Sequence, residues 1–500
     1  MRSITLLASL GLFSAIAMPL VARAGRAQQA TAGTTGLGND VHAWIRRAQE
    51  AIGMTKVGDR VLHAHSALAD EQNYQSDRSY PPFFSAFHSQ EIWFSGATGV
   101  ERVSEQIVFP SADLMSQVTL SDGRFLFAVQ NDKPVLQGAS DRRTRYLNPW
   151  AVIFDWSKAD ADDPKSLRVA GSEVYRDYPR TVLERKTPNG VQKLFLDTKT
   201  GFPVKLDFEE PNPLWGQRHV EYVYSTWVQH EDAQISSAAF RLADGDIELS
   251  QTTGPVDLLP ASQASALLQM PPAPSAPPAG NAGLLQALTP SPVKVGATYV
   301  LAQRFYNEAV TLAGDEIYLF DSTQNEERAK LDHEQIRNLF PGQHKINVVV
   351  TDFAWPHVGG VRYWVAQGAT IIAHKAEKPV LQNIVDRRWT LKPDELEQHR
   401  ASAKFKFVGL DSPQQFAGGA ITMIPIDGIG SEVALAAFVA ADRFLWASDY
   451  IQDTSAPAAY TTDVWNAVQR AGFKPERFAA EHVALNQWEV IEKLQSGNKQ

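Results

Sequence analysis

Alternation of apolar and polar residues dominates the first half of the chain. Between residues 191 and 208, two alternating segments flank the turn sequence Asp-Thr-Lys-Thr-Gly at 197–201, which predicts a β-hairpin with one buried face. Val220, Tyr222 and Tyr224 continue this rhythm, whereas residues 41–52 have the spacing of a helix. We therefore expect residues 38–258 to form a mainly antiparallel β-sheet domain that begins with a helix.

The pattern changes after a stretch rich in proline and alanine. Residues 259–293 have a composition that builds no core, and we expect them to form a linker. Beyond the linker, strand and helix signals alternate, which predicts an α/β layered domain over residues 294–500. The expected strands are 298–301, 316–320, 345–351, 369–373, 434–439 and 444–447, and the expected helices are 326–340 and 357–367.

The first 24 residues have the order of a secretory signal peptide. Arg2 provides a positive start, residues 4–22 are mainly apolar, and Ala-Arg-Ala at 22–24 is a small-residue cleavage pattern. We expect cleavage after Ala24 and a periplasmic or secreted protein. No later segment has the roughly 20 apolar residues that a membrane-spanning helix needs, so no transmembrane segment is expected after cleavage.

Composition narrows the classes of function. The chain has 500 residues, which favours more than one domain. The formal charge of −9 and the lack of a basic stripe argue against a nucleic-acid partner. The cysteine count of zero excludes disulfides, zinc–cysteine clusters and thiol catalysis. The expected partner is a small molecule or an apolar ligand of unknown identity.

Polar residues that follow a buried strand are candidates for a site in α/β folds. After the strand at 345–351 comes the sequence Thr-Asp-Phe-Ala-Trp-Pro-His-Val-Gly-Gly (351–360), and Gly-Ala-Thr-Ile-Ile follows at 368–372. These segments resemble the metallo-β-lactamase superfamily, whose signature is Thr-His-x-His-x-Asp-His-x-Gly-Gly. Residues 438–449, which end at Asp449, and residues 478–482, which end at His482, resemble two later segments of that superfamily.

The resemblance implies a fold and a metal chemistry. It implies an α+β protein in which the β-rich domain is followed by a C-terminal αββα metallo-β-lactamase-like sandwich. The superfamily holds two metal ions with five histidines and two aspartates. Here Asp352, Ala354 and Gly430 stand at histidine positions and Pro356 stands at an aspartate position, so the residues that match are His357, Asp449 and His482.

Three interpretations remain open. The first is an exported hydrolase-like protein with a decayed dinuclear site, inactive or weak as a hydrolase and acting in binding. The second is a hydrolase of an ester, thioester or lactam with one zinc ion on His357, Asp449 and His482. In that case Asp352 would act as a fourth ligand or a general base, so Asp352 is the candidate catalytic residue. In the third, the N-terminal sheet binds a lipid-like or peptide ligand.

A separate pair of histidines lies in the N-terminal half. His63-Ala64-His65 places two imidazoles on one face of a strand. Such a pair is suited to metal binding, although two exposed histidines on a sheet are the simpler explanation of the pattern.

Overall fold

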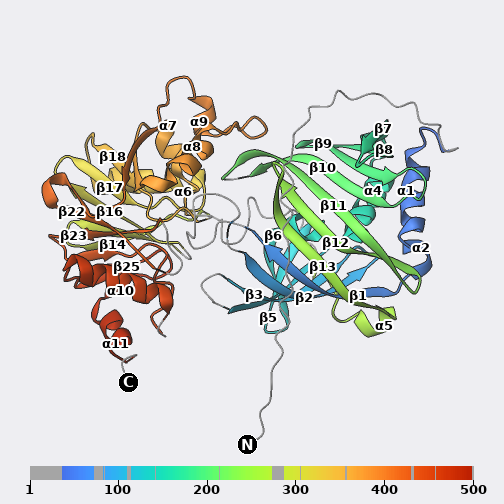
Figure 1. Ribbon diagram of the computed structural model, residues 1–500, viewed down its shortest axis with the longest axis horizontal. Helices are drawn as coiled ribbons and strands as arrows, with labels where there is room; N and C mark the ends of the chain where they lie inside the picture. The colour runs from blue at the N-terminus through green and yellow to red at the C-terminus, as the bar shows by residue number, and fades with distance from the viewer. Residues whose placement is uncertain are drawn as a thin grey trace, which may run out of the picture.

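The computed structural model shows two halves, each built on β-sheets (Figure 1). About two-thirds of the regular elements are strands, and the predicted α+β class is confirmed. The expected signal segment, residues 273–286 of the expected linker, Pro356 and Gly430 lie outside the described residues. The structure describes residues 37–71, 83, 85–109, 114–140, 142–212, 214–272, 287–303, 306–354, 357–428, 433–455 and 458–497.

The N-terminal half is one antiparallel sheet of 13 strands in the order β6-β5-β4-β3-β2-β1-β13-β12-β11-β10-β9-β8-β7. The hairpin predicted at 191–208 is present as β9 and β10, with Leu206 opposite both Leu194 and Tyr222. The strands are β1 (Val61–Asp70), β2 (Ala86–Ser95), β3 (Glu101–Val108), β4 (Leu114–Ser121), β5 (Phe125–Gln130), β6 (Lys133–Ala139), β7 (Leu167–Tyr175), β8 (Tyr178–Thr187), β9 (Gly190–Asp197), β10 (Pro203–Asn212), β11 (Gly216–His230), β12 (Ala233–Ala243) and β13 (Asp246–Leu259).

The curved sheet packs against helices that the sequence predicted only in part. Helix α1 (Val41–Ala51) agrees with the expected helix, but α4 (Pro149–Asp162) was not expected. Its residues 149–153 are all buried, so the helix lacks the polar face that gives a periodic signal. Trp150 and Trp156 lie in the core beside α1 rather than in an open groove. The short helices here are α2 (Met54–Val57), α3 (Arg142–Arg145) and the 3₁₀ turn η1 (Pro164–Ser166).

Part of the expected linker belongs to the N-terminal half. The strand β13 runs to Leu259, and α5 (Ala261–Ala264) follows it directly. Ala264 is fully buried, and the apolar side chains of Leu267 and Leu268 pack beside it against Trp93. The sequence pattern placed these residues in a linker because the surrounding residues are rich in proline. The short apolar segment at 264–268 is too brief to give a helix or strand signal of its own.

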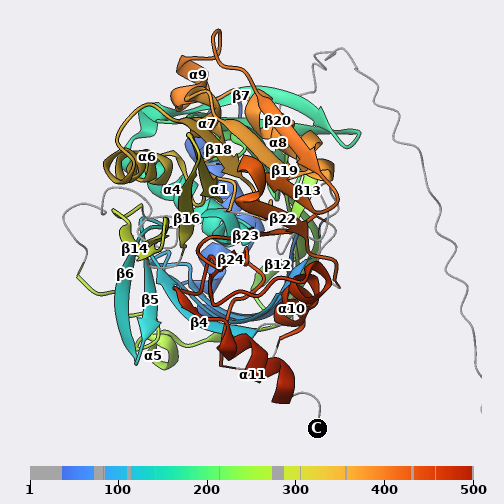
Figure 2. The same cartoon turned by 90° about the vertical axis from the view of Figure 1, so that its left-hand side faces the viewer.

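The C-terminal half stacks two sheets between two layers of helices (Figure 2). The seven-stranded sheet is β14-β15-β16-β17-β18-β19-β20, in which β17 to β20 are parallel, and the six-stranded sheet is β21 to β26 in order. The strands are β14 (Ser291–Val295), β15 (Thr298–Ala302), β16 (Glu308–Ala313), β17 (Glu316–Phe320), β18 (Lys345–Val349), β19 (Thr370–His374), β20 (Lys406–Leu410), β21 (Gln414–Phe416), β22 (Ile421–Pro425), β23 (Leu435–Val439), β24 (Phe444–Trp446), β25 (Arg477–Ala479) and β26 (Asn486–Gln487).

Alternating side chains of the strands assign each layer. Phe320 and Trp446 lie in the core between the two sheets. On the outer faces, Leu319 packs with α6 to α9, and Leu445 packs with α10 and α11. The helices are α6 (Glu326–Leu339), α7 (Val361–Ala366), α8 (Lys378–Asp386), α9 (Glu395–Gln398), α10 (Ala459–Ala471) and α11 (Glu489–Gly497), with 3₁₀ turns η2 (Lys375–Glu377) and η3 (Ala417–Gly419).

One predicted helix is shorter than expected. The sequence predicted a helix over 357–367, but residues 357–360 form a turn and α7 begins at Val361. The reason is close backbone packing: a Cβ on Gly359 would lie 2.1 Å from the carbonyl oxygen of Gln324, and the amide of Gly360 donates to the carbonyl of Ser322 at 2.9 Å. The turn directs His357 away from the helix axis.

The two halves are in contact through residues 214–217 and 387–390. The amide of Gln217 donates to the carbonyl of Arg388 at 3.1 Å, and the guanidinium of Arg387 donates to the carbonyl of Trp215 at 2.8 Å. Leu214 is buried among apolar side chains of the C-terminal half. Gly216 has a φ of +68° and lies so close to Trp389 that a Cβ would be 2.1 Å from its ring.

Candidate metal centre

Four side chains meet where three strands of the C-terminal half end. His357 follows β18, Asp449 follows β24, and Glu481 and His482 follow β25. Because β24 and β25 are parallel, their carboxyl ends lie at the same edge of the six-stranded sheet. Backbone bonds fix this edge: the amide of Glu481 donates to the carbonyl of Ser448 at 3.1 Å.

The ligand atoms of the four residues form one cluster. One such atom from each of His357, Asp449, Glu481 and His482 lies within 4.8 Å of all the others. The Nε2 atom of His357 is 2.7 Å from Oε2 of Glu481 and 4.0 Å from Oδ2 of Asp449. The Nε2 atom of His482 is 3.0 Å from Oδ1 of Asp449.

Burial separates the four residues into an inner group and an outer one. The side chains of Glu481, Asp449 and His357 are 0%, 2% and 4% exposed, whereas that of His482 is 30% exposed. Tyr306 borders both imidazoles, with its ring centroid 5.1 Å from that of His482 and 6.0 Å from that of His357. The cluster is therefore buried on three sides and reaches solvent along His482.

The carboxylates control the protonation of both histidines. Burial alone lowers the pKa of His357, but Glu481 and Asp449 outweigh it and raise the pKa well above its ordinary value. Burial also opposes the charge on His482, and Asp449 raises its pKa. Burial raises the pKa of Asp449, but the two imidazoles reverse this and hold it below the usual range. The cluster is electrically balanced only while protons or a cation lie between these groups.

Further buried carboxyl groups lie behind His357. Asp352, Asp321 and Glu377 are fully buried, and Asp352 and Asp321 both raise the pKa of Glu377, after burial itself. Within the described part of the chain, neither carboxyl oxygen of Glu377 has a hydrogen-bond donor. The raised pKa favours the neutral form of Glu377 in the metal-free protein, and a cation bound nearby would favour its charged form.

The four residues fit a single transition-metal ion. Imidazole nitrogen and carboxylate oxygen are ordinary zinc ligands, at about 2.0–2.2 Å from the metal, so neighbouring ligand atoms of a tetrahedral site lie about 3.4 Å apart. The separations of 2.7, 3.0 and 4.0 Å lie on both sides of that value. Small rotations of the side chains would therefore bring the four atoms to zinc-binding distances.

Asp352 takes a different place from the other predicted residues. Its Oδ1 atom is 3.4 Å from Nδ1 of His357, on the opposite side of the ring from the nitrogen that faces Glu481. The same Oδ1 accepts the amide of Ala354 at 2.5 Å. Asp352 is therefore placed to orient the His357 ring, and Glu481 occupies the position that a fourth ligand would need.

The structure brings His357, Asp449 and His482 together, as the sequence suggested, and adds Glu481, which sequence reasoning missed. Glu481 directly precedes His482 in the segment 478–482. Adjacent residues in an extended chain point in opposite directions, so adjacency gave no sign of a shared site. The chain turns at 480–483, where the amides of Ala480 and Val483 each donate to the other's carbonyl, and this turn brings both side chains to one place.

A second metal position has fewer donors. Ala354, at a position where the resemblance implies a histidine, is buried and carries no donor atom. Pro356 and Gly430 lie outside the described residues.

Comparisons with known proteins find similarity in structure alone. No known family and no curated protein matches the sequence. The chain is similar to the DIM-1 metallo-β-lactamase (12% identity, 42% of this chain, 97% of that chain, TM-score 0.33), to TMB-1 (11%, 43%, 100%, 0.32) and to a metallo-β-lactamase from Hirschia baltica (15%, 42%, 97%, 0.32). At this level of similarity, the function has to be argued from the site itself.

Proposed function

We propose that this chain is an exported metallo-hydrolase-like protein that binds one divalent metal ion, with the second position of a former dinuclear site lost. The observation that carries the proposal is the meeting of His357, Asp449, Glu481 and His482 from three separate segments. Three of these side chains are buried, and in the metal-free protein protons on the two imidazoles compensate the carboxylates. A metal ion would displace those protons and compensate the carboxylates in their place.

Each residue has a role in this proposal. His357, Asp449, Glu481 and His482 hold the ion. The carboxylate of Asp352 lies 3.4 Å from Nδ1 of His357 and would favour the tautomer that leaves Nε2 free to bind metal. Bound zinc would supply Lewis acidity and lower the pKa of a water molecule that it holds. Tyr306 covers one side of the cluster and limits the access of bulk water.

Hydrolysis by this site is expected to be weak or absent, so binding is the main role in the proposal. Ala354 provides no imidazole where the superfamily mechanism needs one. The alternative is a mononuclear hydrolase of an ester, thioester or lactam. The observation that favours this alternative is the 30% exposure of the His482 side chain, which leaves a path from solvent to the cluster.

Metal content tests the proposal. Purified full-length protein, dialysed against zinc, should hold one equivalent in the C-terminal cluster. Glu481→Gln and His482→Ala should each remove that equivalent or weaken its binding strongly. His333→Ala is a matched control, because His333 is half-buried on α6 and bonds to Tyr363 instead. Retention of the full zinc content by both cluster variants would contradict the proposal.

Hydrolysis assays separate the two functions. Ester, thioester and β-lactam substrates should be turned over slowly or not at all by the zinc-loaded protein. Turnover that is zinc-dependent and is abolished by His482→Ala but not by His333→Ala would instead establish the mononuclear hydrolase.

A further inference from the structure

A second group of metal-ligand residues lies on the N-terminal sheet, far along the chain from the cluster at His357. His63 and His65 are two residues apart on β1, and both point to the sheet face opposite the core, because Leu62 and Ala64 between and beside them belong to that core. Glu91 on β2 is directly opposite His65 in the register of the two strands.

The three side chains lie within reach of one ion. The Nε2 atom of His63 is 2.8 Å from Oε1 of Glu91. The imidazole centroids of His63 and His65 are 5.1 Å apart, and one ligand atom from each of the three residues lies within 4.8 Å of the other two. We propose that His63, His65 and Glu91 form a surface site for one divalent transition-metal ion, best suited to zinc.

Neighbouring residues hold the first histidine in a fixed orientation. The His63 ring stacks on Trp93, with centroids 4.9 Å apart and an angle of 11° between the planes. Its Nδ1 atom faces Oδ2 of Asp257 on β13 at 4.0 Å. At 4.0 Å this contact is an ion pair rather than a hydrogen bond, so the stacking on Trp93 orients the ring and Asp257 adds only its negative charge.

An irregularity in the sheet occurs at the second histidine. Ala64 pairs with Val256 and Ser66 pairs with Thr253, so two residues of β13, Gly254 and Pro255, lie opposite the single residue His65. A β-bulge of this kind changes the direction of side chains next to it. The extra residue lies on β13, and the pairing of β1 with β2 is regular, so His65 remains directly opposite Glu91.

A comparable group of side chains on the same sheet is already compensated by a lysine and is therefore a poorer metal site. Asp207, His219 and Glu221 also lie within 4.8 Å of one another. There, the ammonium of Lys205 already donates to Asp207 at 2.8 Å and to Glu221 at 2.7 Å, so a protein cation compensates both carboxylates. Glu91 faces the imidazole of His63 instead. That ring is itself a ligand in the proposed site.

The proposal requires three protein ligands and leaves at least one coordination position to solvent. Two imidazoles and one carboxylate with an open position are an ordinary donor set for zinc. Because the ligands come from β1 and β2, a bound ion would also tie these strands together. The site is independent of the cluster at His357. Zinc binding at that cluster must therefore be removed by mutation before binding at His63 is measured.

Zinc and Co²⁺ titrations of the full-length chain test the proposal in a background that carries Glu481→Gln and His482→Ala. This protein should bind one equivalent. Adding His65→Ala or Glu91→Gln should weaken binding at least roughly tenfold, the loss that even outer-sphere partners of a metal cause. Asp257→Asn should cause a smaller loss. His230→Ala, at the end of β11 on the same sheet, is the control and should leave the affinity unchanged.

The location of the ion has its own readout. Zinc should protect His63 and His65 from carbethoxylation by diethyl pyrocarbonate, measured peptide by peptide, and should leave the reactivity of His399, which directly follows α9, unchanged. The thermal transition of each metal-free variant shows whether it folds. If His65→Ala does not fold, Glu91→Gln tests the site alone, because the Glu91 side chain is 39% exposed and its replacement disturbs little packing. The proposal is overturned if the silenced background binds no zinc, or if binding persists in folded His65→Ala and Glu91→Gln proteins.

Discussion

At the scale of single residues, Asp352 shows how one substitution changes the role of a position. The sequence resemblance placed it where a metal-binding histidine belongs, and the structure places its carboxylate against Nδ1 of His357. The side chain also holds the loop through the amide of Ala354. Asp352 therefore acts on a metal ion only through His357.

Replacing Asp352 with asparagine tests this role. Asp352→Asn retains an oxygen for the amide of Ala354 but loses the charge that faces His357. We expect zinc to bind roughly 10–100-fold more weakly, as is usual when the partner of a metal-binding histidine is changed. Competition with a chromophoric chelator measures the affinity. An unchanged affinity in a folded variant would show that Asp352 does not orient the ring.

The two histidines of the cluster make the stability of the metal-free protein depend on pH. The pKa values of His357 and His482 are both raised in the folded state above the ordinary value of 6.5. A raised pKa means that the folded state holds the proton more tightly, so this stabilisation is complete below about pH 6.5 and is lost as the pH rises through the folded pKa.

Chemical denaturation in the presence of a chelator measures this dependence. The free energy of unfolding of the metal-free protein should fall between pH 6.5 and pH 9, and His482→Ala should make the decline shallower. Zinc affinity should change in the opposite direction and rise with pH, because the metal competes with protons for both imidazoles. A pH-independent free energy of unfolding over this range would contradict the assigned protonation.

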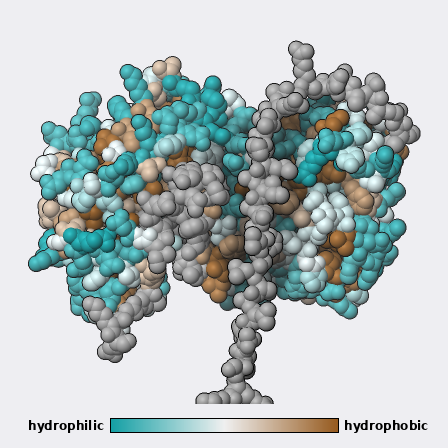
Figure 3. All heavy atoms as spheres, viewed as in Figure 1, coloured by the Kyte–Doolittle hydropathy of each residue, from teal (hydrophilic) through white to brown (hydrophobic). Residues whose placement is uncertain are grey.

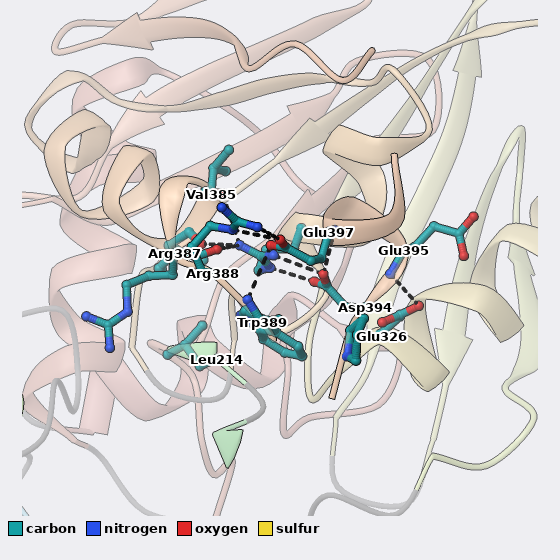
Figure 4. A network of polar contacts seen from close by, with 12 residues as sticks. Leu214, Glu326, Val385, Arg387, Arg388, Trp389, Asp394, Glu395 and Glu397 are labelled. Carbon is teal, nitrogen blue, oxygen red and sulfur yellow. Dashed lines mark hydrogen bonds and ion pairs between the residues drawn. The ribbon is translucent and has the colours of Figure 1, made fainter. Parts of the chain in front are cut away.

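At the scale of elements, the segment from α8 to α9 is held by a network of charged groups (Figure 4). Glu397 accepts hydrogen bonds from Arg388 at 2.7 Å and from Arg400 at 2.8 Å, and its other partner is the amide of Trp389 at 3.2 Å. Burial opposes its charge, but these donors outweigh burial and lower the pKa of Glu397 to about 2. Arg362 is paired with Asp394 nearby.

Neutralising Glu397 should loosen this segment. Glu397→Gln loses charge-assisted hydrogen bonds from two guanidinium groups. Because Arg388 is 65% exposed, we expect the free energy of unfolding at pH 7 to fall by about 1 kcal/mol or less. A depressed pKa stabilises the fold above pH 4.5, and this stabilisation disappears as the pH falls towards 2. The free energies of unfolding of wild type and Glu397→Gln should therefore become equal as the pH falls towards 2. Glu334→Gln, on α6 outside this network, is the control, and an equal loss in both variants would contradict the assignment.

The elements that the sequence predicted well are those with one buried face. Strand β17 occupies 316–320 as predicted, and α6 agrees with the expected 326–340 to within one residue. The pattern failed where a run of consecutive residues is buried, as at 149–153 in α4, and where close backbone contact ends a helix early, as at Gly359 and Gly360. The same limit applies to the site: His357, Asp449 and His482 carry a sequence signal, but Glu481 reaches the cluster only through a turn that no spacing reveals.

At the scale of the whole molecule, hydrophilic residues cover most of the described surface in the view of Figure 3. No helix in the described residues is both long and apolar enough to cross a membrane. The proposed export depends on the first 24 residues, which lie outside the described part.

Intact-mass measurement on exported material should give a chain that begins at Gly25, and a full-length chain retained in membranes would contradict cleavage.

Limited proteolysis tests the division into two halves. Because Ala264, Leu267 and Leu268 pack on the N-terminal sheet and β14 begins at Ser291, we expect the first cuts between residues 271 and 290, where the sequence is rich in proline and alanine. Two fragments should remain after cutting. Initial cleavage inside either set of sheets would place the boundary elsewhere.

The pairing of β1 with both β2 and β13 has a consequence for how the chain acquires its structure. β1 ends at Asp70 and its partner β2 begins at Ala86, but on the other side the register joins Val61 to Leu259. Pairings between residues so distant in sequence close large loops and slow folding. During synthesis, one edge of β1 therefore stays unpaired until the ribosome has released the chain as far as residue 259. An unpaired edge invites aggregation, so refolding yields of this protein should fall steeply as its concentration rises.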